Sequence, residues 1–350
     1  MNTVTIVLVV AAILVAVWLI IRLLRTRSFS MSGKVFVITG GSRGLGLVMA
    51  REICRQGGKV VLLARNMEEL THAEDDLLKR GGDVLAIACD LQEQAHIEAA
   101  VRRTIERFGR IDVLINNAGI IQVGPFDHMQ SSDFEQSIGL HFWAPYYLTM
   151  EVIPHMRKQG AGRIVNISSI GGRVGVPHLS PYCAGKFALT GFSDAIRAEL
   201  AADNIQVTTV APGLMRTGSH VNAQFKGDHD AEFAWFATAS GLPMISMSAE
   251  RAARRIIAAA RRGQSTLTLT FAARLAIAGN AVAPSLTAFT MRTINRFLPQ
   301  AVAASGDKLQ SGWESRSQQL PARWMTGLAD AAIVANNEAL AGNGAAKELI

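Results

Sequence analysis

The chain has 350 residues, of which 49% are hydrophobic, so a sizeable core can form and disorder is expected only at the ends. Its formal net charge is +7 and it carries no nucleic-acid-binding motif, which excludes nucleic acid and favours a phosphorylated cofactor or an anionic lipid as a partner. Three scattered cysteines without a CxxC pair, and histidines without paired spacing, argue against a disulfide scaffold and predict no metal site.

Residues 1–24 are predicted to form a transmembrane anchor. Residues 2–21 carry no charged side chain, and an apolar helix of about 20 residues spans roughly 30 Å, the thickness of the bilayer core. Arg22, Arg25 and Arg27 follow this run, which predicts a single-pass membrane protein with its catalytic domain facing the cytoplasm. A cleaved signal peptide, and hence a secreted enzyme, is the alternative, but no basic residue precedes the run.

Residues 31–270 alternate between short β-branched runs and longer helical patterns. The predicted strands are 34–39, 60–64, 84–88, 113–116, 163–167 and 206–210, with 266–270 as a candidate seventh. The helical patterns between them include 45–56 and 67–80. This alternation predicts an α/β fold with a doubly wound parallel sheet and helices on both faces.

Residues 271–350 are predicted to form a C-terminal helical extension. Residues 271–298 are apolar but are interrupted by Arg274, Pro284 and Arg292. A second membrane span is therefore less favoured than a helix that lies at a membrane interface or covers the substrate. Residues 342–350 have the composition of a frayed tail.

A glycine-rich turn follows the first strand and opens the first helix. It reads Thr39-Gly40-Gly41-Ser42-Arg43-Gly44-Leu45-Gly46. Glycines allow a tight turn and close approach to a pyrophosphate, and the helix N-terminus offers free N–H groups. An ordinary βα turn without a ligand is the alternative, so the pattern needs support from the rest of the chain.

Several motifs in the same order give that support, and over residues 34–270 the chain resembles the short-chain dehydrogenase/reductase family. The family's TGxxxGxG motif, its Asn-Asn-Ala-Gly motif, its adenine-contacting acidic residue and its nicotinamide-side segment all have counterparts here. These counterparts are Thr39, Gly40, Gly44 and Gly46; Asn116, Asn117, Ala118 and Gly119; Asp90 and Leu91; and Pro212, Gly213 and Thr217. The resemblance implies a Rossmann fold, a bound dinucleotide, also contacted by Ser42, Arg43 and Leu45, and a homo-oligomer.

The end of the second strand predicts which dinucleotide is bound. An acidic residue there would hold the ribose 2′-hydroxyl of NAD, but this strand ends in Arg65. Arg65 and Arg43 can form charge-assisted bonds to a 2′-phosphate, so NADP(H) is the predicted cofactor. The alternative is that both are solvated surface arginines.

Tyr182 and Lys186 are four residues apart and would share one face of a helix. A Lys ammonium beside a phenol is expected to lower the pKa of Tyr182 from about 10 toward neutrality, which makes Tyr182 usable as a general acid or base. The resemblance implies that Ser169, thirteen residues earlier, hydrogen-bonds the substrate carbonyl, and that Lys186 also holds the nicotinamide ribose. The mechanism it implies is hydride delivery from NADPH to a carbonyl that Ser169 polarises and Tyr182 protonates.

His141 is a departure from the family, which usually has an asparagine at this place to hold a water of the proton relay. A histidine titrates near neutral pH and could hold that water or relay a proton itself. It could also indicate a slower relay or lost activity. A tolerated substitution is the favoured interpretation, because the groups for hydride transfer are intact.

The substrate is expected to be an apolar carbonyl or alcohol, such as a keto-sphingoid, a steroid or a retinoid, because a membrane anchor would place the site beside membrane lipid. The resemblance implies that residues 225–247, with Phe233, Trp235, Phe236 and Met244, form a lid over it; the alternative is that this aromatic stretch belongs to the core. His178 and Leu179 are predicted to line the entrance. A catalytically weak or inactive NADP(H)-binding membrane sensor or scaffold is the rival function, and His141 is its only support.

Overall fold

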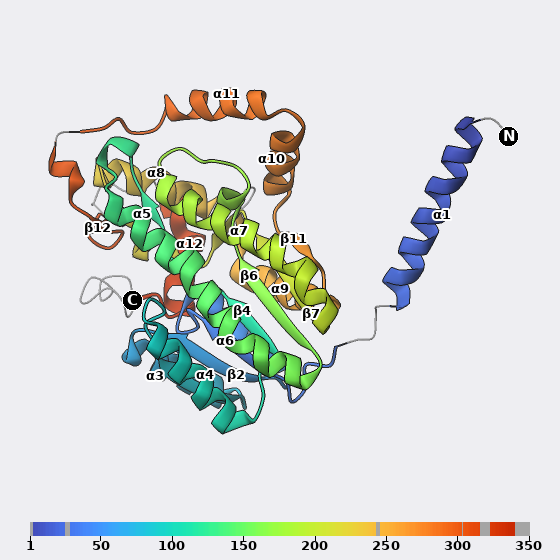
Figure 1. Ribbon diagram of the computed structural model, residues 1–350. Coiled ribbons are helices and arrows are strands. Elements are labelled where there is room, and N and C mark those ends of the chain that lie inside the picture. Colours follow the sequence, from blue (N-terminus) through green and yellow to red (C-terminus); the bar gives the residue numbers. More distant parts are fainter. Residues whose placement is uncertain (1–2, 25–28, 243–245, 303, 316–322, 340–350) are drawn as a thin grey trace. The chain divides into compact units, whose positions relative to one another are not determined.

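The computed structural model describes residues 3–24, 29–242, 246–302, 304–315 and 323–339. The chain divides into two compact units, residues 1–30 and residues 31–350. The first unit contains the helix α1 (Thr3–Leu24) and the second contains every other helix and strand (Figure 1). The predicted tail 342–350 and the predicted lid residue Met244 lie outside the described residues.

The predicted single-pass membrane location is wrong. Within the part of the chain that the structure describes, no helix is both long enough and apolar enough to cross a membrane. The prediction of an anchor over residues 1–24, with the rest of the chain on the cytoplasmic side, is therefore withdrawn.

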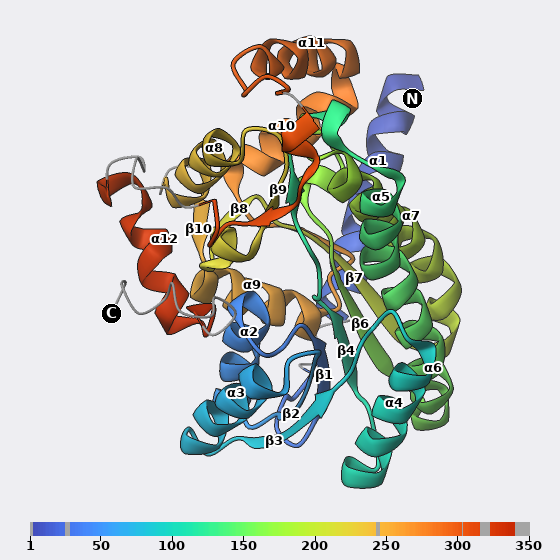
Figure 2. The same ribbon diagram turned by 90° about the vertical axis from the view of Figure 1, so that its left-hand side faces the viewer.

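The second unit is built on one seven-stranded sheet in which every strand pair is parallel (Figure 2). Its strands, in spatial order, are β11 (Thr266–Thr268), β7 (Ile205–Ala211), β6 (Gly162–Ile167), β4 (Val113–Asn116), β1 (Val35–Thr39), β2 (Lys59–Ala64) and β3 (Asp83–Ala88). The six predicted strands and the candidate seventh are all confirmed, with small shifts at their ends. The strands are apolar runs because a parallel sheet is buried on both faces, and all five residues of β1 are buried.

The strand order reverses between β1 and β4, which are neighbours although β2 and β3 separate them in the sequence. Ile38 of β1 pairs with Ile115 of β4, so the two strands end at the same edge of the sheet. In doubly wound folds, ligands bind outside the carboxyl ends of the strands at this reversal. The loops after Thr39 and Asn116 therefore mark the expected ligand crevice.

Helices cover both faces of the sheet (Figure 2). One face carries α2 (Gly44–Arg55), α3 (Met67–Lys79) and α9 (Ala249–Arg262), and the other carries α4 (Gln94–Phe108), α5 (Ser131–Ile138), α6 (Ala144–Gln159) and α7 (Ser180–Leu200). Local signals delimit them: the Asn66 side chain accepts from the first N–H groups of α3, and Gly109 ends α4 with a φ of +73°.

The remaining elements surround the carboxyl edge of the sheet. They are the strands β5 (Gln122–Val123), β8 (Leu214–Arg216), β9 (Gln224–Phe225), β10 (Ser246–Ser248) and β12 (Gln310–Ser311), and the helices α8 (His229–Gly241), α10 (Phe271–Val282), α11 (Pro284–Asn295) and α12 (Arg323–Ala335). Strand β12 pairs with β9, which in turn pairs with β5, so these three strands form a small separate sheet.

The apolar stretch 271–298 forms two helices, where the sequence suggested a single one. Pro284 is the first residue of α11, and Ala283 before it has a φ of −136° and a ψ of 67°, outside the helical region. Proline lacks an N–H and disfavours a helical conformation in the preceding residue, so the helix breaks at this point.

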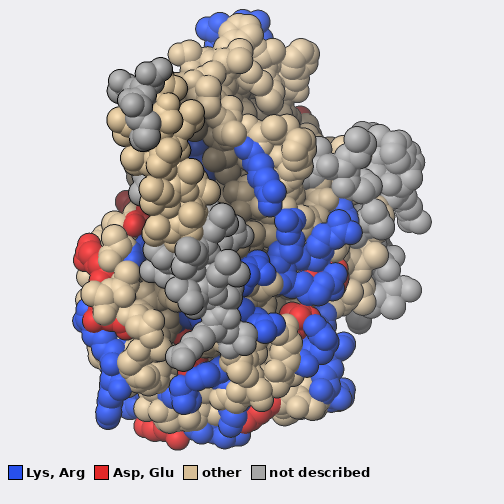
Figure 3. Space-filling view, turned by 90° about the vertical axis from the view of Figure 1, so that its right-hand side faces the viewer, with Lys and Arg blue, Asp and Glu red and all other residues tan. Residues whose placement is uncertain are grey.

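On the face of the molecule in Figure 3, Lys and Arg side chains are more widespread than Asp and Glu, in line with the net charge of +7.

Candidate active site

The glycine turn between β1 and α2 is bound tightly to the loop after β4. The Thr39 hydroxyl oxygen accepts hydrogen bonds from the N–H groups of Asn117 (2.8 Å) and Ala118 (2.9 Å). Gly40 has a φ of +60°, and a Cβ at Gly46 would overlap the carbonyl oxygen of Gly40. Because only glycine fits this geometry, the turn brings backbone N–H groups close to the N-terminus of α2.

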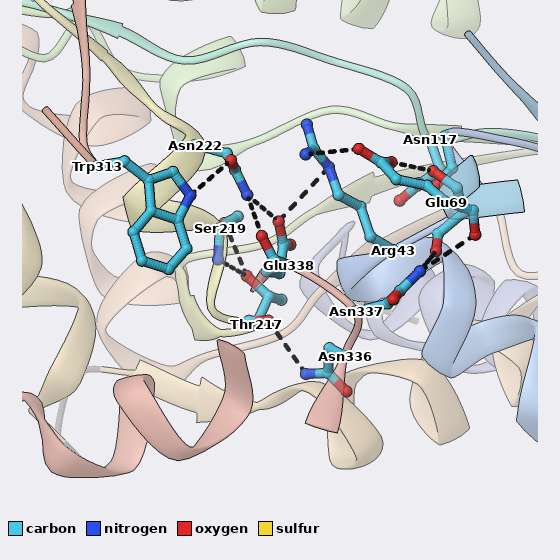
Figure 4. Close-up of polar contacts among 12 residues, drawn as sticks. Arg43, Glu69, Asn117, Thr217, Ser219, Asn222, Trp313, Asn336, Asn337 and Glu338 are labelled. Carbon is cyan, nitrogen blue, oxygen red and sulfur yellow. Dashed lines mark hydrogen bonds and ion pairs between the residues drawn. The ribbon is translucent and has the colours of Figure 1, made fainter. Parts of the chain in front are cut away.

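The polar residues of the turn are held by α3. The Ser42 hydroxyl donates to Glu69 Oε2 at 2.8 Å, and Arg43 Nη1 lies 3.3 Å from Glu69 Oε1 (Figure 4). Glu69 is buried, so these two contacts fix the turn against α3 from the protein interior. Arg65, the other predicted 2′-phosphate residue, is exposed at the end of β2.

The other predicted cofactor residues lie at the ends of neighbouring strands. Asp90 follows β3 and accepts from the Gln92 N–H at 3.0 Å, while Leu91 packs into the core. Pro212 follows β7, and its carbonyl accepts from the Ile170 N–H at 2.8 Å, which ties it to the Ser169 loop. Gly213 precedes β8 and Thr217 follows it, so the predicted set lies along one edge of the sheet.

Ser169, Tyr182 and Lys186 come together at the start of α7. Ser169 follows β6, and its hydroxyl forms a hydrogen bond with the Tyr182 phenol. Lys186 is 4% exposed, donates to the Ile167 carbonyl at 2.8 Å, and lies 5.7 Å from the centre of the Tyr182 ring. A hydroxyl, a phenol and an amine thus meet in one place, a combination that can polarise and protonate a carbonyl oxygen.

Burial determines the acidity of this group. It raises the pKa of the Tyr182 phenol to about 12 and lowers the pKa of Lys186 to about 7, because loss of water penalises the charged form of each. The expected lowering of the Tyr182 pKa toward neutrality is therefore not present in this arrangement. An amine with a pKa near 7 carries little positive charge above neutral pH, so it gives the phenolate little stabilisation there.

His141 is buried beside these residues on a π-helical turn, Gly139–Trp143. Its Nε2 accepts from the Ile120 N–H at 3.2 Å, and its ring lies edge-on to the Tyr182 ring at 5.3 Å. Its Nδ1 lies 3.1 Å from the Ser137 hydroxyl, which donates onward to a carbonyl, so Nδ1 carries the proton.

This environment makes His141 a neutral, fixed hydrogen-bonding group. Burial, with the nearby Lys186 as the second cause, holds the pKa of His141 well below its usual value. Both ring nitrogens of His141 are engaged, so the alternative in which this ring titrates near neutral pH and relays a proton has no free ring nitrogen in this arrangement.

The predicted lid and the predicted entrance residues meet in a buried polar contact. His178 has a φ of +62°, and its Nδ1 lies 2.7 Å from Oε1 of Glu232 on α8. Trp235 Nε1 donates to the other Glu232 oxygen at 2.7 Å. Helix α8 is thereby attached to the loop that precedes Tyr182.

Sequence reasoning missed a second group at this site, residues 336–338 after α12. The Gly44 N–H donates to the Asn336 carbonyl at 2.9 Å, and Glu338 lies against Arg43 (Figure 4). These residues carry no recognisable motif, and Asn337 contacts Ser42 across a separation of 295 positions, so no local signal could have placed them here.

Comparison of the chain with known proteins identifies a family that it matches. The family model of the short chain dehydrogenases matches residues 34–226. Oxidoreductase BOA17 of Botryotinia fuckeliana is 37% identical over 184 residues, which cover 53% of this chain and 66% of the relative. The 11-beta-hydroxysteroid dehydrogenase-like protein 4A of Arabidopsis thaliana is 36% identical over 194 residues, which cover 55% of this chain and 64% of that relative. This chain thus spans just under two thirds of the length of these relatives.

Two solved structures are similar in fold. L-sorbose reductase from Gluconobacter frateurii, complexed with NADPH and L-sorbose, has 27% identity and a TM-score of 0.62. A metagenomic short-chain oxidoreductase in complex with NADP has 29% identity and a TM-score of 0.56. Each comparison covers 69% of this chain and 97% of the solved chain, so nearly the whole of each neighbour has a counterpart here.

Proposed function

The chain belongs to the short chain dehydrogenase family, and from this premise we propose that it reduces the carbonyl of an apolar small molecule, or oxidises the corresponding alcohol. The observation that carries the proposal is the meeting of Ser169, Tyr182 and Lys186 beside the end of β6. The prediction of NADP(H) as the cofactor is confirmed by the solved neighbours, which are complexed with NADPH and with NADP.

The residues of the glycine turn fit a dinucleotide. Gly40 and Gly44 both have positive φ values, and the space that a Cβ at Gly46 would fill is closed by the turn itself. Asn117 and Ala118 hold the turn in place, and Arg43 and Arg65 would contact a 2′-phosphate. When bound, the cofactor supplies the hydride; positioning and proton transfer come from the chain.

The carbonyl would be held by the Ser169 hydroxyl, which donates to its oxygen as negative charge develops there. Tyr182, protonated at neutral pH because burial raises its pKa to about 12, then gives its proton to that oxygen. Lys186 orients this end of α7 through its bond to the Ile167 carbonyl. His141 supports the Tyr182 ring from the side.

An apolar substrate is proposed because apolar side chains surround Tyr182. A buried cluster packs next to it and includes Val123, Leu179, Cys183, Phe225, Phe233 and Phe236. An open hollow of about 480 Å³ lies beside Cys183, and its lining includes Val176 and, on α11, Met291 and Arg292. Helix α11 thus forms one wall of the approach to α7, as expected for a segment that covers the substrate.

A panel of ketones tests this function. Purified protein is mixed with NADPH and either a steroid ketone, a long-chain aliphatic ketone or L-sorbose, and NADPH consumption is followed by absorbance. We expect turnover of an apolar ketone and little or none of the sugar, because the side chains around Tyr182 offer few partners for its hydroxyls. Preference for L-sorbose would contradict the apolar assignment, and tight NADPH binding without turnover of any ketone would support the sensor instead.

The pKa of Tyr182 predicts different pH profiles for the two directions. Oxidation needs the phenolate, whose population below a pKa of about 12 rises about tenfold for each pH unit, so kcat/KM for an alcohol should rise steadily with pH. Reduction needs the protonated phenol, so Tyr182 should impose no fall in its rate between about pH 7 and about pH 10. Initial rates in both directions check this. An oxidation rate that levels off near neutral pH would show that the phenol is far more acidic than its burial implies.

A further inference from the structure

The segment after α12 binds the glycine turn where a dinucleotide phosphate is expected. The Gly44 N–H lies at the N-terminus of α2 and has no acceptor within the helix; it donates to the Asn336 carbonyl at 2.9 Å. The Asn337 side chain donates to the Ser42 carbonyl at 2.9 Å (Figure 4). Arg51 of α2 donates to the Ala335 carbonyl at 2.8 Å, which anchors the end of α12 as well.

Glu338 occupies the space beside Gly44, the third glycine of the turn. A Cβ at Gly44 would lie 2.5 Å from Glu338 Oε1, so this carboxyl group uses the room that the missing side chain provides. Glu338 Oε2 lies 3.5 Å from Arg43 Nε and accepts from the Asn222 amide at 2.6 Å. The side chain of Glu338 is 2% exposed, so its contacts are made inside the protein.

The same segment also reaches the opposite wall of the crevice. The Asn336 side chain donates to the Thr217 carbonyl at 3.1 Å, and this contact is buried. Thr217 belongs to the segment predicted to contact the nicotinamide side of the cofactor. Residues 336–338 therefore bridge the two walls between which a dinucleotide would lie (Figure 4).

We propose that residues 336–338 compete with the cofactor for the glycine turn. This segment must leave the turn before NADP(H) binds. This inference rests on the proposed function, because it names a regulation of that same site. A carboxyl group and a backbone carbonyl occupy the positive end of α2, where phosphate oxygens would otherwise accept the same hydrogen bonds. The measured affinity is then the intrinsic affinity multiplied by the fraction of molecules in which the segment has left.

The competition should weaken as the pH rises. Burial is the largest cause that raises the pKa of Glu338 to about 7; the charge of Glu69 on α3 adds to it, while Arg43 on the turn and the Asn222 amide oppose it. A carboxyl group with a raised pKa in the bound segment takes up a proton on binding. Binding of the segment is therefore strongest at low pH and weakens as the pH rises to about 7.

The first experiment measures the dissociation constant of NADPH by fluorescence titration of the full chain. Glu338→Ala should bind NADPH about tenfold more tightly than the unchanged protein. Glu338→Gln keeps the shape of the side chain but cannot ionise, so this variant should bind NADPH weakly. The affinity of the unchanged protein for NADPH should rise between about pH 6 and about pH 8, and Glu338→Gln should lose most of this rise. Glu106→Ala, an exposed glutamate on α4, is the matched control and should behave like the unchanged protein.

The second experiment follows amide hydrogen exchange of the peptide that covers α12 and residues 336–339. Saturating NADP should speed its exchange if the segment is displaced, and circular dichroism checks that each variant is folded. Equal NADPH affinity in Glu338→Ala and the unchanged protein would overturn the proposal, as would slower exchange with NADP, which would mean that the segment encloses the cofactor. Absence of NADPH binding in all variants would overturn the proposed function itself, and this result differs from equal binding.

Discussion

Replacement of Tyr182 by Phe is expected to lower kcat for carbonyl reduction by about 10²–10⁴-fold, the usual contribution of a positioned proton donor. The phenol hydroxyl is the group that hydrogen-bonds Ser169, and phenylalanine keeps the ring that lies edge-on to His141. The substitution therefore removes the proton donor and keeps the packing. Single-turnover measurements with NADPH and a ketone identified by the panel would give the rate of the chemical step directly.

Tyr146→Phe is the matched control, because it makes the same chemical change on α6. The Tyr146 ring packs against Phe142 and Phe192, and these contacts do not need the hydroxyl. NADPH affinity should change far less than kcat in Tyr182→Phe, since only the reacting oxygen loses a partner. If Tyr182→Phe retained most of its rate, the proton would have to come from another group, and the assignment of Tyr182 would fail.

Gly46→Ala is expected to abolish measurable NADPH binding and to destabilise the fold. An added methyl group would overlap the Gly40 carbonyl oxygen and would come within 2.9 Å of the Asn117 side-chain nitrogen. Both obstacles belong to the glycine turn, so the turn must open to admit the methyl group. Overpacking of this kind costs about 1–3 kcal/mol, and a thermal or urea unfolding curve measures it.

Gly191→Ala gives the matched control within α7. A Cβ at Gly191 meets nothing within 4 Å, and alanine is favoured over glycine inside a helix by about 0.5–1 kcal/mol. This variant should be at least as stable as the unchanged protein and should bind NADPH normally. Normal NADPH binding by Gly46→Ala would show that the turn does not need its close packing.

The sheet and the glycine turn could be predicted because their signals are local. Apolar runs of four to seven residues separated by helical patterns are sufficient to predict the strands β1, β2, β3, β4, β6 and β7. The spacing of Tyr182 and Lys186 likewise places them on one helical face, whatever the rest of the chain does. Such features depend on neighbours within a few positions.

Other features depend on distant parts of the chain and could not be predicted. The acidity of Tyr182 follows mainly from its burial, and burial also lowers the pKa of the neighbouring Lys186. Glu69 orients Ser42 and Arg43 from α3, although nothing around it in the sequence indicates this contact. The apolar run 2–21 led to a wrong prediction of a different kind. Its composition and length suggested a membrane crossing that the described residues do not support.

The packing of α12 against α8 has a consequence for the order of ligand addition. Helix α12 leads directly into residues 336–338, and α8 is fastened by Glu232 to the loop preceding Tyr182. Withdrawal of residues 336–338 from α2 would therefore loosen, at the same moment, the loop before Tyr182 that lines the hollow beside Cys183. We therefore expect ordered kinetics, in which the nucleotide binds before the substrate and leaves after the product.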